Sequence, residues 1–228
     1  STKSLASPPS PSPGAPDKPA NANAIGVYLD SLAAAVPAPG GGSATGLAGA
    51  LGAALVCMVA NYTVGRPKYA AVEEEVRAAL EEADALRVKL MELAEVDHKA
   101  YERVAAARKL PRSNEGERML RSDEIQRATR AAAHPPMEMA GACRRALELS
   151  GVVAKDGNAS LASDAGVAAL FSEAALRASA INVRVNLAAV EDPVFVRALD
   201  EKLDALLEGS AALKEEILAI AGRRMVGG

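Results

Sequence analysis

The feature that most constrains the fold is an uninterrupted helical pattern that runs from Pro67 to Leu110. No proline or glycine lies between these two residues. Proline is favoured at the start of a helix and the residue before a proline is disfavoured within one, so Pro67 begins the segment and Pro111 ends it. No stretch of the chain shows the alternation of polar and apolar residues that is typical of a half-buried strand. The sequence therefore predicts an all-α protein.

Proline, glycine and capping residues divide the rest of the chain into further helices, and Ser43 is expected to cap the second of them. The expected ranges are 23–36, 43–65, 67–110, 113–134, 136 to the segment 155–158, 161–190, and 193 to the C-terminus. A chain of 228 residues, half of them apolar, can bury one sizeable core. We therefore expect about seven helices in one bundle-like domain over residues 23–228.

Residues 1–22 are mainly serine, proline and alanine, a composition that predicts a disordered tail outside the fold. This tail has neither the continuous apolar run of a secretory signal nor the repeated arginines of a transit peptide. Cys57 and Cys143 are far apart and lack the CxxC spacing of a zinc or redox site. We expect both thiols to be reduced and buried, in a cytoplasmic protein without a metal site.

The composition predicts neither a nucleic acid nor a membrane as partner. The formal charge of −3 gives no basic field for phosphates, and two Phe, four Tyr and no Trp leave few rings for stacking on bases. The apolar run 47–60 is shorter than the roughly 18 residues that a membrane span requires. A buried central helix is the interpretation that the sequence favours.

Asp97 is the most unusual position in the long helix. An apolar stripe follows one side of this helix, and Asp97 interrupts it between Leu93 and Tyr101. Glu95 and His98 lie off the stripe and are expected in solvent. A carboxylate among apolar side chains is costly unless it is paired or protonated. Asp97 is therefore either half of an ion pair with an arginine of another helix or a catalytic carboxyl whose pKa burial has shifted.

Three consecutive glycines, Gly40, Gly41 and Gly42, precede the apolar helix. Free N–H groups at a helix start, together with the positive end of the dipole, favour an anion or a carbonyl oxygen. A flexible turn that lets two helices pack is the alternative. Within the helix, small residues recur every fourth position, so that a second helix can approach closely. They are Gly42, Gly46, Ala50 and Ala54.

The sixth expected helix carries polar residues along one side. Asp164 and Asn182 are about five turns apart and share a direction around the helix, and Asn186 follows one turn later. Asp164 could instead complement the positive end of its helix, because it lies in the first turn. Carboxamides in an apolar groove are suited to a flat heterocycle with several hydrogen-bond donors and acceptors.

Four separated segments add a stronger signal: 37–69, the pair "DHKAY" and "KLPR" within 97–112, "DGNASLASDAGVAAL" at 156–170, and "INVRVN" at 181–186. In this order they resemble the cyclodeaminase/cyclohydrolase family of folate one-carbon enzymes. The resemblance covers nearly everything after the tail. It implies an all-helical fold, homodimeric packing, and a tetrahydrofolate substrate with no further cofactor.

The family reactions concern the carbon held between N5 and N10 of tetrahydrofolate. A cyclohydrolase adds water to 5,10-methenyltetrahydrofolate and yields 10-formyltetrahydrofolate. A cyclodeaminase closes 5-formiminotetrahydrofolate to the methenyl form and releases ammonia. Each reaction passes through a tetrahedral carbon and needs a group that moves a proton to or from nitrogen.

The resemblance also implies site residues. Asp97 is the acid of the family's D-x-x-A-(Phe/Tyr) motif, and Glu95 stands where many relatives have a second acid, so the identity of the catalytic acid stays open. Arg66 and Lys68 match a basic segment whose partners would be the glutamyl carboxylates of folate, with Pro67 replacing a middle basic residue. The other expected substrate-binding residues are Gly40, Gly41, Gly42, Ser43, Asp164, Asn182 and Asn186.

The sequence leaves the choice between cyclohydrolase and cyclodeaminase open. A third possibility from another class is a helical dimer without activity that keeps a folate-like pocket as a sensor or scaffold. Polar residues that interrupt several apolar stripes argue against that third possibility, because a packing module would not need them.

Overall fold

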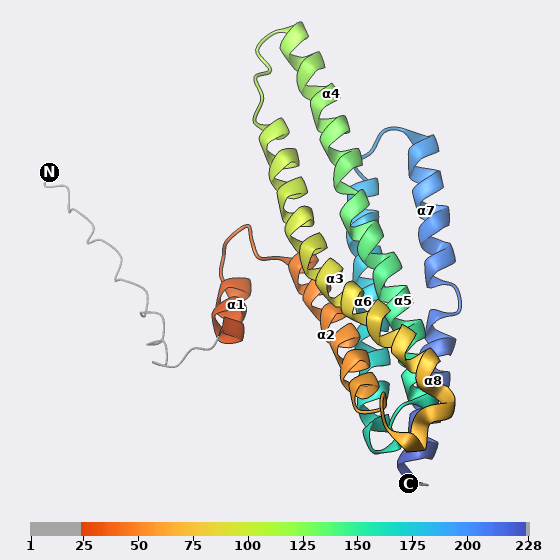
Figure 1. Ribbon diagram of the computed structural model, residues 1–228. Helices are drawn as coiled ribbons and strands as arrows, with labels where there is room; N and C mark the ends of the chain where they lie inside the picture. The colour runs from red at the N-terminus through yellow and green to blue at the C-terminus, as the bar shows by residue number, and fades with distance from the viewer. Residues whose placement is uncertain (1–23, 227–228) are drawn as a thin grey trace, which may run out of the picture. The chain divides into compact units, whose positions relative to one another are not determined.

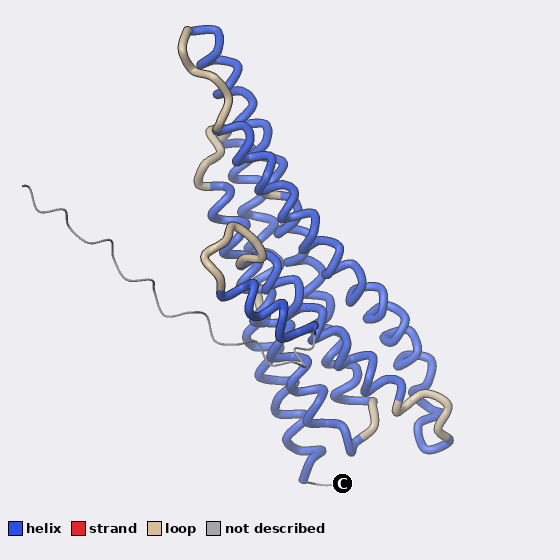
Figure 2. Tube along the Cα trace, turned by 90° about the vertical axis from the view of Figure 1, so that its left-hand side faces the viewer, coloured by secondary structure: helices blue, strands red, loops and turns tan. Residues whose placement is uncertain are grey.

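A computed structural model of the chain describes residues 24–226, and all of the regular structure in that range is helical (Figures 1 and 2). The expected disordered tail, residues 1–22, lies outside the described residues. The described chain divides into two units between Ala38 and Pro39, and each unit is described by itself. In the first unit, helix α1 (Ala24–Ala33) ends before the expected Val36, and none of its residues is buried.

The second unit holds the remaining helices, which confirms the all-α prediction. They are α2 (Gly41–Asn61), α3 (Glu73–Arg108), α4 (Glu115–Ala132), α5 (His134–Asp156), α6 (Ala162–Leu187), α7 (Pro193–Leu207) and α8 (Ser210–Val226), with short 3₁₀ helices η1 (Pro67–Val72) and η2 (Ala159–Leu161).

The largest differences from the predicted boundaries concern the long helix and the last one. The long helix begins at Glu73, not at Pro67, because the preceding residues form η1, and acidic side chains then fill the first turn of α3. The last expected helix is two helices, α7 and α8. They are separated by Gly209, whose φ of +68° is a left-handed conformation that glycine adopts without strain.

Helix α2 lies at the centre of the second unit, in contact with α3, α5 and α6. Its glycines face these neighbours. A Cβ atom at Gly46 would lie 2.8 Å from the carbonyl oxygen of Leu90 in α3, and one at Gly49 would lie 2.7 Å from Sγ of Cys143 in α5. Both distances are too short for a real Cβ. The small residues of α2 therefore allow close helix packing, as the four-residue spacing predicted.

The length and hydropathy of α2 also suit a membrane span, since the helix has 21 residues. It is longer than the apolar run 47–60 because it begins among the glycines. Of the most apolar 18-residue stretch of α2, 56% is buried against the rest of the chain. The core helix of a bundle has the same properties. Both cysteines are buried and free of disulfides, as expected.

The helices α3 and α4 form a hairpin whose loop projects beyond the neighbouring helices of the second unit (Figures 1 and 2). At this end α3 packs against α4 through small residues such as Ala100 and Ala107. Tyr101, expected on the apolar stripe, is 54% exposed instead. The stripe prediction is wrong for Tyr101, because α4 covers the side of α3 that carries Ala100 and Ala107, but Val104, the next residue of the stripe, is buried as expected.

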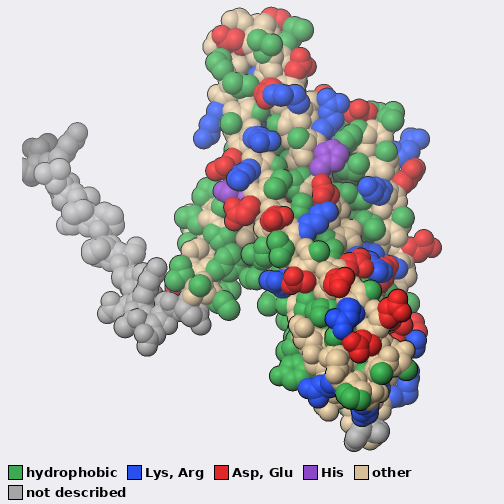
Figure 3. Space-filling model, viewed as in Figure 1, with side chains coloured by type: hydrophobic (Ala, Val, Ile, Leu, Met, Phe, Trp, Pro, Cys, Tyr) green, Lys and Arg blue, Asp and Glu red, His purple; other side chains and the backbone are tan. Residues whose placement is uncertain are grey.

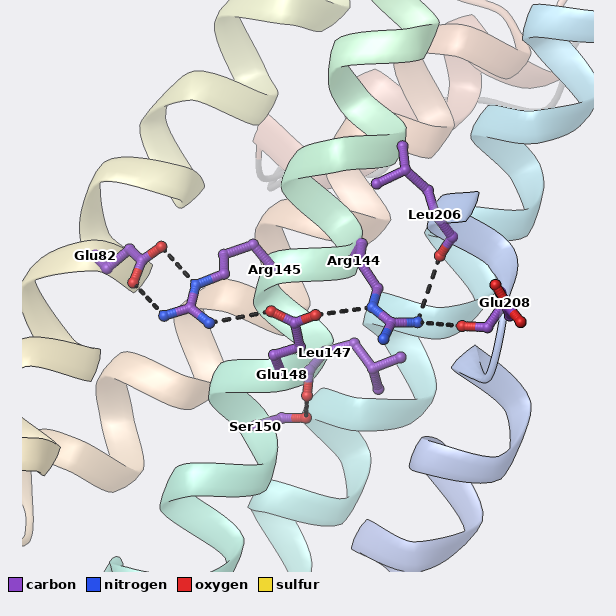
Figure 4. A network of polar contacts seen from close by, with 8 residues as sticks. All are labelled: Glu82, Arg144, Arg145, Leu147, Glu148, Ser150, Leu206 and Glu208. Carbon is purple, nitrogen blue, oxygen red and sulfur yellow. Dashed lines mark hydrogen bonds and ion pairs between the residues drawn. The ribbon is translucent and has the colours of Figure 1, made fainter. Parts of the chain in front are cut away.

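A network of charges joins three parts of the second unit (Figure 4). Arg145 of α5 binds Glu82 of α3 through two hydrogen bonds of 2.6 and 2.8 Å, and it also donates to Glu148. Arg144 donates to Glu148 and, at 2.8 Å, to the backbone carbonyl of Glu208 between α7 and α8. The network therefore fixes the break between α7 and α8 against α5.

Candidate functional site

Asp97 lies on α3 before the projecting hairpin, and its side chain is half-buried. No ion pair joins it to an arginine or lysine in the part of the chain that the structure describes, so the structural ion pair considered above is absent there. Burial raises the pKa of the Asp97 carboxyl above its ordinary value of 3.8, and the charge of His98 offsets this only in part. A carboxyl with a raised pKa can hold and release a proton nearer neutral pH.

The Asp97 carboxyl rests on the start of α2. A Cβ atom at Gly42 would lie 2.8 Å from Cγ of Asp97, and closer still to Oδ2. A side chain at position 42 would therefore displace this carboxyl. The N-cap of α2 is Gly40, in an extended conformation and without a side-chain cap. The prediction that Ser43 caps the helix is wrong, because the helix already begins at Gly41.

Asn182 of α6 approaches the same helix start. Its Nδ2 donates to Oγ1 of Thr45 at 3.4 Å, and the Thr45 hydroxyl donates to the carbonyl of Gly41 at 2.7 Å. The carboxamide oxygen of Asn182 is the atom nearest to a Cβ built on Gly41, at 3.8 Å. Thr45, which is 4% exposed, thus orients Asn182. Sequence analysis missed this role, although the threonine one turn after the glycines was a usable signal.

Asn186 has a different role from Asn182. Its Nδ2 donates to the carbonyls of Ala132, at the end of α4, and of Asn182, at 2.9 and 3.2 Å. The amide therefore ties α6 to the end of α4 beside the site. We call Gly40–Ser43, Thr45, Asp97, Asn182 and Asn186 the glycine-end site.

The other predicted site residues lie at the opposite end of α2. Arg66 and Lys68 follow its C-terminus, and the 21 residues of the helix span about 30 Å. Asp164 is in the first turn of α6, five turns before Asn182 and thus about 27 Å away along the helix. One chain therefore does not bring Asp164 together with the two asparagines in one groove.

Aromatic rings support both cations at this second end. The Arg66 guanidinium lies 5.7 Å from the ring centre of Tyr62, and the Lys68 ammonium lies 5.6 Å from that of Tyr69. We call Arg66, Lys68 and these two tyrosines the basic-end cluster. Elsewhere on the face of the second unit seen in Figure 3, acidic and basic side chains are interspersed, without a large area of one sign.

The fold and the site define an all-helical protein in which a half-buried carboxyl lies on the glycine-rich start of a central helix. Comparison with known proteins gives the family. Residues 24–205 match the formiminotransferase-cyclodeaminase family, and the chain belongs to it. Helix α8 lies beyond the matched range.

Two curated relatives illustrate the range of the family. The chain is 39% identical to a methenyltetrahydrofolate cyclohydrolase of Methylorubrum extorquens. The alignment spans 193 residues, which are 85% of this chain and 93% of that protein. It is 28% identical to the formimidoyltransferase-cyclodeaminase of Gallus gallus over 92% of this chain, but spans only 39% of that longer protein.

A solved structure has the same fold. The crystal structure of a formiminotetrahydrofolate cyclodeaminase from Thermotoga maritima aligns with a TM-score of 0.73 and 32% identity, over 88% of this chain and 94% of that one. The resemblance inferred from the four sequence segments is thereby confirmed.

Proposed function

We propose that the chain is a folate one-carbon enzyme that acts on the carbon between N5 and N10 of tetrahydrofolate. The observation that carries the proposal is the Asp97 carboxyl, held against Gly42 with a raised pKa. The hydrolysis of 5,10-methenyltetrahydrofolate to 10-formyltetrahydrofolate is our first candidate reaction. It is supported by the similarity to a cyclohydrolase along nearly the whole of that relative.

In this reaction a water molecule adds to the methenyl carbon and gives a tetrahedral intermediate. We propose that Asp97 accepts the proton that the water loses. Asp97 then donates this proton to N5 as the bond between N5 and the carbon breaks. The hydroxyl proton leaves as the formyl C=O forms on N10. Neither this reaction nor the deamination oxidises or reduces the carbon, so we expect no cofactor beyond the folate itself.

The second candidate is the closure of 5-formiminotetrahydrofolate with loss of ammonia. The Thermotoga maritima neighbour supports it. N10 would attack the formimino carbon and lose its proton to Asp97, and Asp97 would pass a proton to the departing nitrogen, which leaves as ammonia. The same carboxyl thus serves either reaction, and the substrate decides between them.

We further propose that the active form is a homodimer. Folate would use Asn182 at the glycine-end site for its heterocycle and the basic-end cluster for its glutamyl carboxylates, yet these lie at opposite ends of α2. In an isologous pair with the α2 helices side by side and antiparallel, the glycine end of one chain lies beside the basic end of its partner. Large apolar side chains exposed on α2 and α6 would be covered in such a pair: Leu51, Leu170, Phe171, Ile181 and Val185.

Sedimentation tests the dimer directly. Ile181→Asp places a charge on a side chain that is 64% exposed in the single chain, and should convert the dimer to a monomer at micromolar concentration. Val194→Asp is the matched control, since Val194 is 77% exposed on α7 and outside the proposed interface. A monomeric wild-type protein would remove the dimer from the proposal. Free thiols at Cys57 and Cys143 suit the cytoplasm, where we expect the protein.

The reaction is tested by the ultraviolet absorbance of the methenyl form. Wild-type protein mixed with 5,10-methenyltetrahydrofolate should remove this absorbance faster than buffer does. Mixed with 5-formiminotetrahydrofolate, a cyclodeaminase would produce it. No change in either mixture would favour a sensor or scaffold over an enzyme.

A further inference from the structure

Asn158 joins two loops by hydrogen bonds, the loop between α5 and η2 and the loop after α2. Neither loop carries the group that moves the proton in the proposed reaction. Its backbone N–H donates to Oγ1 of Thr63 at 2.8 Å, and its Nδ2 donates to the carbonyl of Tyr62 at 3.1 Å. The Thr63 hydroxyl in turn donates to the carbonyl of Val59, at 2.7 Å. The loop between α5 and η2 is thus tied to the end of α2.

Tyr69 closes this network from the other side. Its hydroxyl donates to Oδ1 of Asn158 and accepts from the backbone N–H of Ala159, both at 3.3 Å. Oδ1 of Asn158 also accepts from the N–H of Ser160, at 3.1 Å. Asn158 is 9% exposed, and both polar atoms of its side chain already have partners within the protein. Its side chain is therefore suited to hold the loops and not to bind a substrate.

The segment held in this way carries the two cations. Tyr62 and Tyr69 stand at its two ends, and these are the rings on which Arg66 and Lys68 lie. The backbone between them is stiffened by Pro67, whose ring limits its φ at the start of η1, and by hydrogen bonds from the N–H of Arg66 to the carbonyl of Thr63 and from the N–H of Tyr69 to the carbonyl of Arg66. Arg66 and Lys68 are exposed, so their charges face outward from a fixed backbone.

We propose that Asn158 and Tyr69 are positioning residues that hold Arg66 and Lys68 for the carboxylates of a polyglutamyl folate. This inference rests on the proposed function, and adds to it two residues that position the cations. Two cations on a stiff segment match two carboxylates of a glutamyl chain. Because the cluster would meet the glutamyl chain and not the carbon between N5 and N10, the network sets affinity for the substrate and leaves the chemical step unchanged.

The variant Tyr69→Phe tests the proposal, since it removes one hydroxyl and keeps the ring beneath Lys68. KM for a polyglutamyl substrate should rise about three- to ten-fold while kcat stays the same. Ser160→Ala is the matched control, because the Ser160 side chain makes none of these hydrogen bonds and lies in the same loop. A fall in kcat with KM unchanged would overturn the proposal.

A double-mutant cycle shows whether Tyr69 acts through the cations. In a chain that carries Arg66→Ala and Lys68→Ala, the further change Tyr69→Phe should have no additional effect on KM. An effect as large as in the wild type would overturn the proposal.

Calorimetric binding of polyglutamyl tetrahydrofolate separates this inference from the proposed reaction. Wild-type binding without turnover of either folate would refute the reaction, while a three- to ten-fold weaker Kd in Tyr69→Phe would still support the positioning role. An unchanged Kd in Tyr69→Phe would overturn the positioning role alone. A wild-type protein that binds no folate would overturn both.

Discussion

The close approach of Asp97 to Gly42 gives a prediction whose size follows from the geometry. In Gly42→Ala the new Cβ would lie 2.8 Å from Cγ of Asp97, whereas carbon atoms in contact are about 3.5–4.0 Å apart. Cγ of Asp97 must therefore retreat by at least roughly 1 Å, and Oδ2, which the new Cβ would approach most closely, must move further. A displacement of this size at a catalytic group costs about 100-fold in rate. We expect kcat to fall by about that factor, with the protein still folded.

The neighbouring glycine supplies the control. A Cβ at Gly41 would find its nearest atom, Oδ1 of Asn182, at 3.8 Å, which is ordinary contact. Gly41→Ala should therefore keep most of its activity and melt at the same temperature or slightly higher, because alanine favours the helix. Turnover and thermal melting of both variants check this. Equal turnover in Gly42→Ala and Gly41→Ala would refute the reasoning, since the two substitutions differ mainly in what the new methyl group meets.

Two further predictions concern pH. Burial raises the pKa of Asp97, so its ionised form destabilises the fold, and Asp97→Asn should melt at an equal or higher temperature at pH 7. The difference in melting temperature should vanish below pH 3.8, because the Asp97 carboxyl is then protonated in both the folded and the unfolded state. A variant that melts below the wild type at pH 7 would contradict the account. Burial alone would raise the pKa of Glu148, but the hydrogen bonds from Arg144 and Arg145 outweigh it and hold the pKa below 4.5. The contribution of Glu148 to stability is therefore present above pH 4.5 and is lost as the pH falls through its pKa in the folded state. Glu148→Gln should lower the melting temperature at pH 7 but not in strong acid. Melting of this variant at the wild-type temperature at both pH values would contradict the prediction.

The helices were predictable because their ends are local events. Pro111 and Pro193 stop or start helices through the geometry of the proline ring, whatever surrounds them. The break at Gly209 was missed, since a lone glycine in a helical pattern is often tolerated, and the hydrogen bond from Arg144 to the Glu208 carbonyl that supports the break comes from a distant helix. The start of α2 was shifted for a similar reason, because Gly40 takes the capping conformation without any side-chain hydrogen bond.

The candidate site was predictable only in part. Asp97 and Asn182 stood out because each is a polar residue on an apolar stripe, and the structure brings both to the glycine end of α2. The contact between Asp97 and Gly42 joins two helices, so no local pattern could reveal it. Helical periodicity put Asp164 on the same side of α6 as Asn182, but five turns of helix separate them by about 27 Å, so a shared side did not mean a shared groove. Asn158 was missed because its partners come from residues nearly a hundred positions earlier.

The central claim is that Asp97 moves the proton in the reaction at the N5/N10 carbon. It is tested most directly by single-turnover rates of Asp97→Asn and Glu95→Gln, measured on folded protein with the substrate that the wild type converts. The account predicts that Asp97→Asn still binds folate and loses about two or more powers of ten in rate, while Glu95→Gln stays near the wild type. Near-normal turnover in a stable Asp97→Asn protein would contradict it, and a loss confined to Glu95→Gln would move the acid two residues upstream.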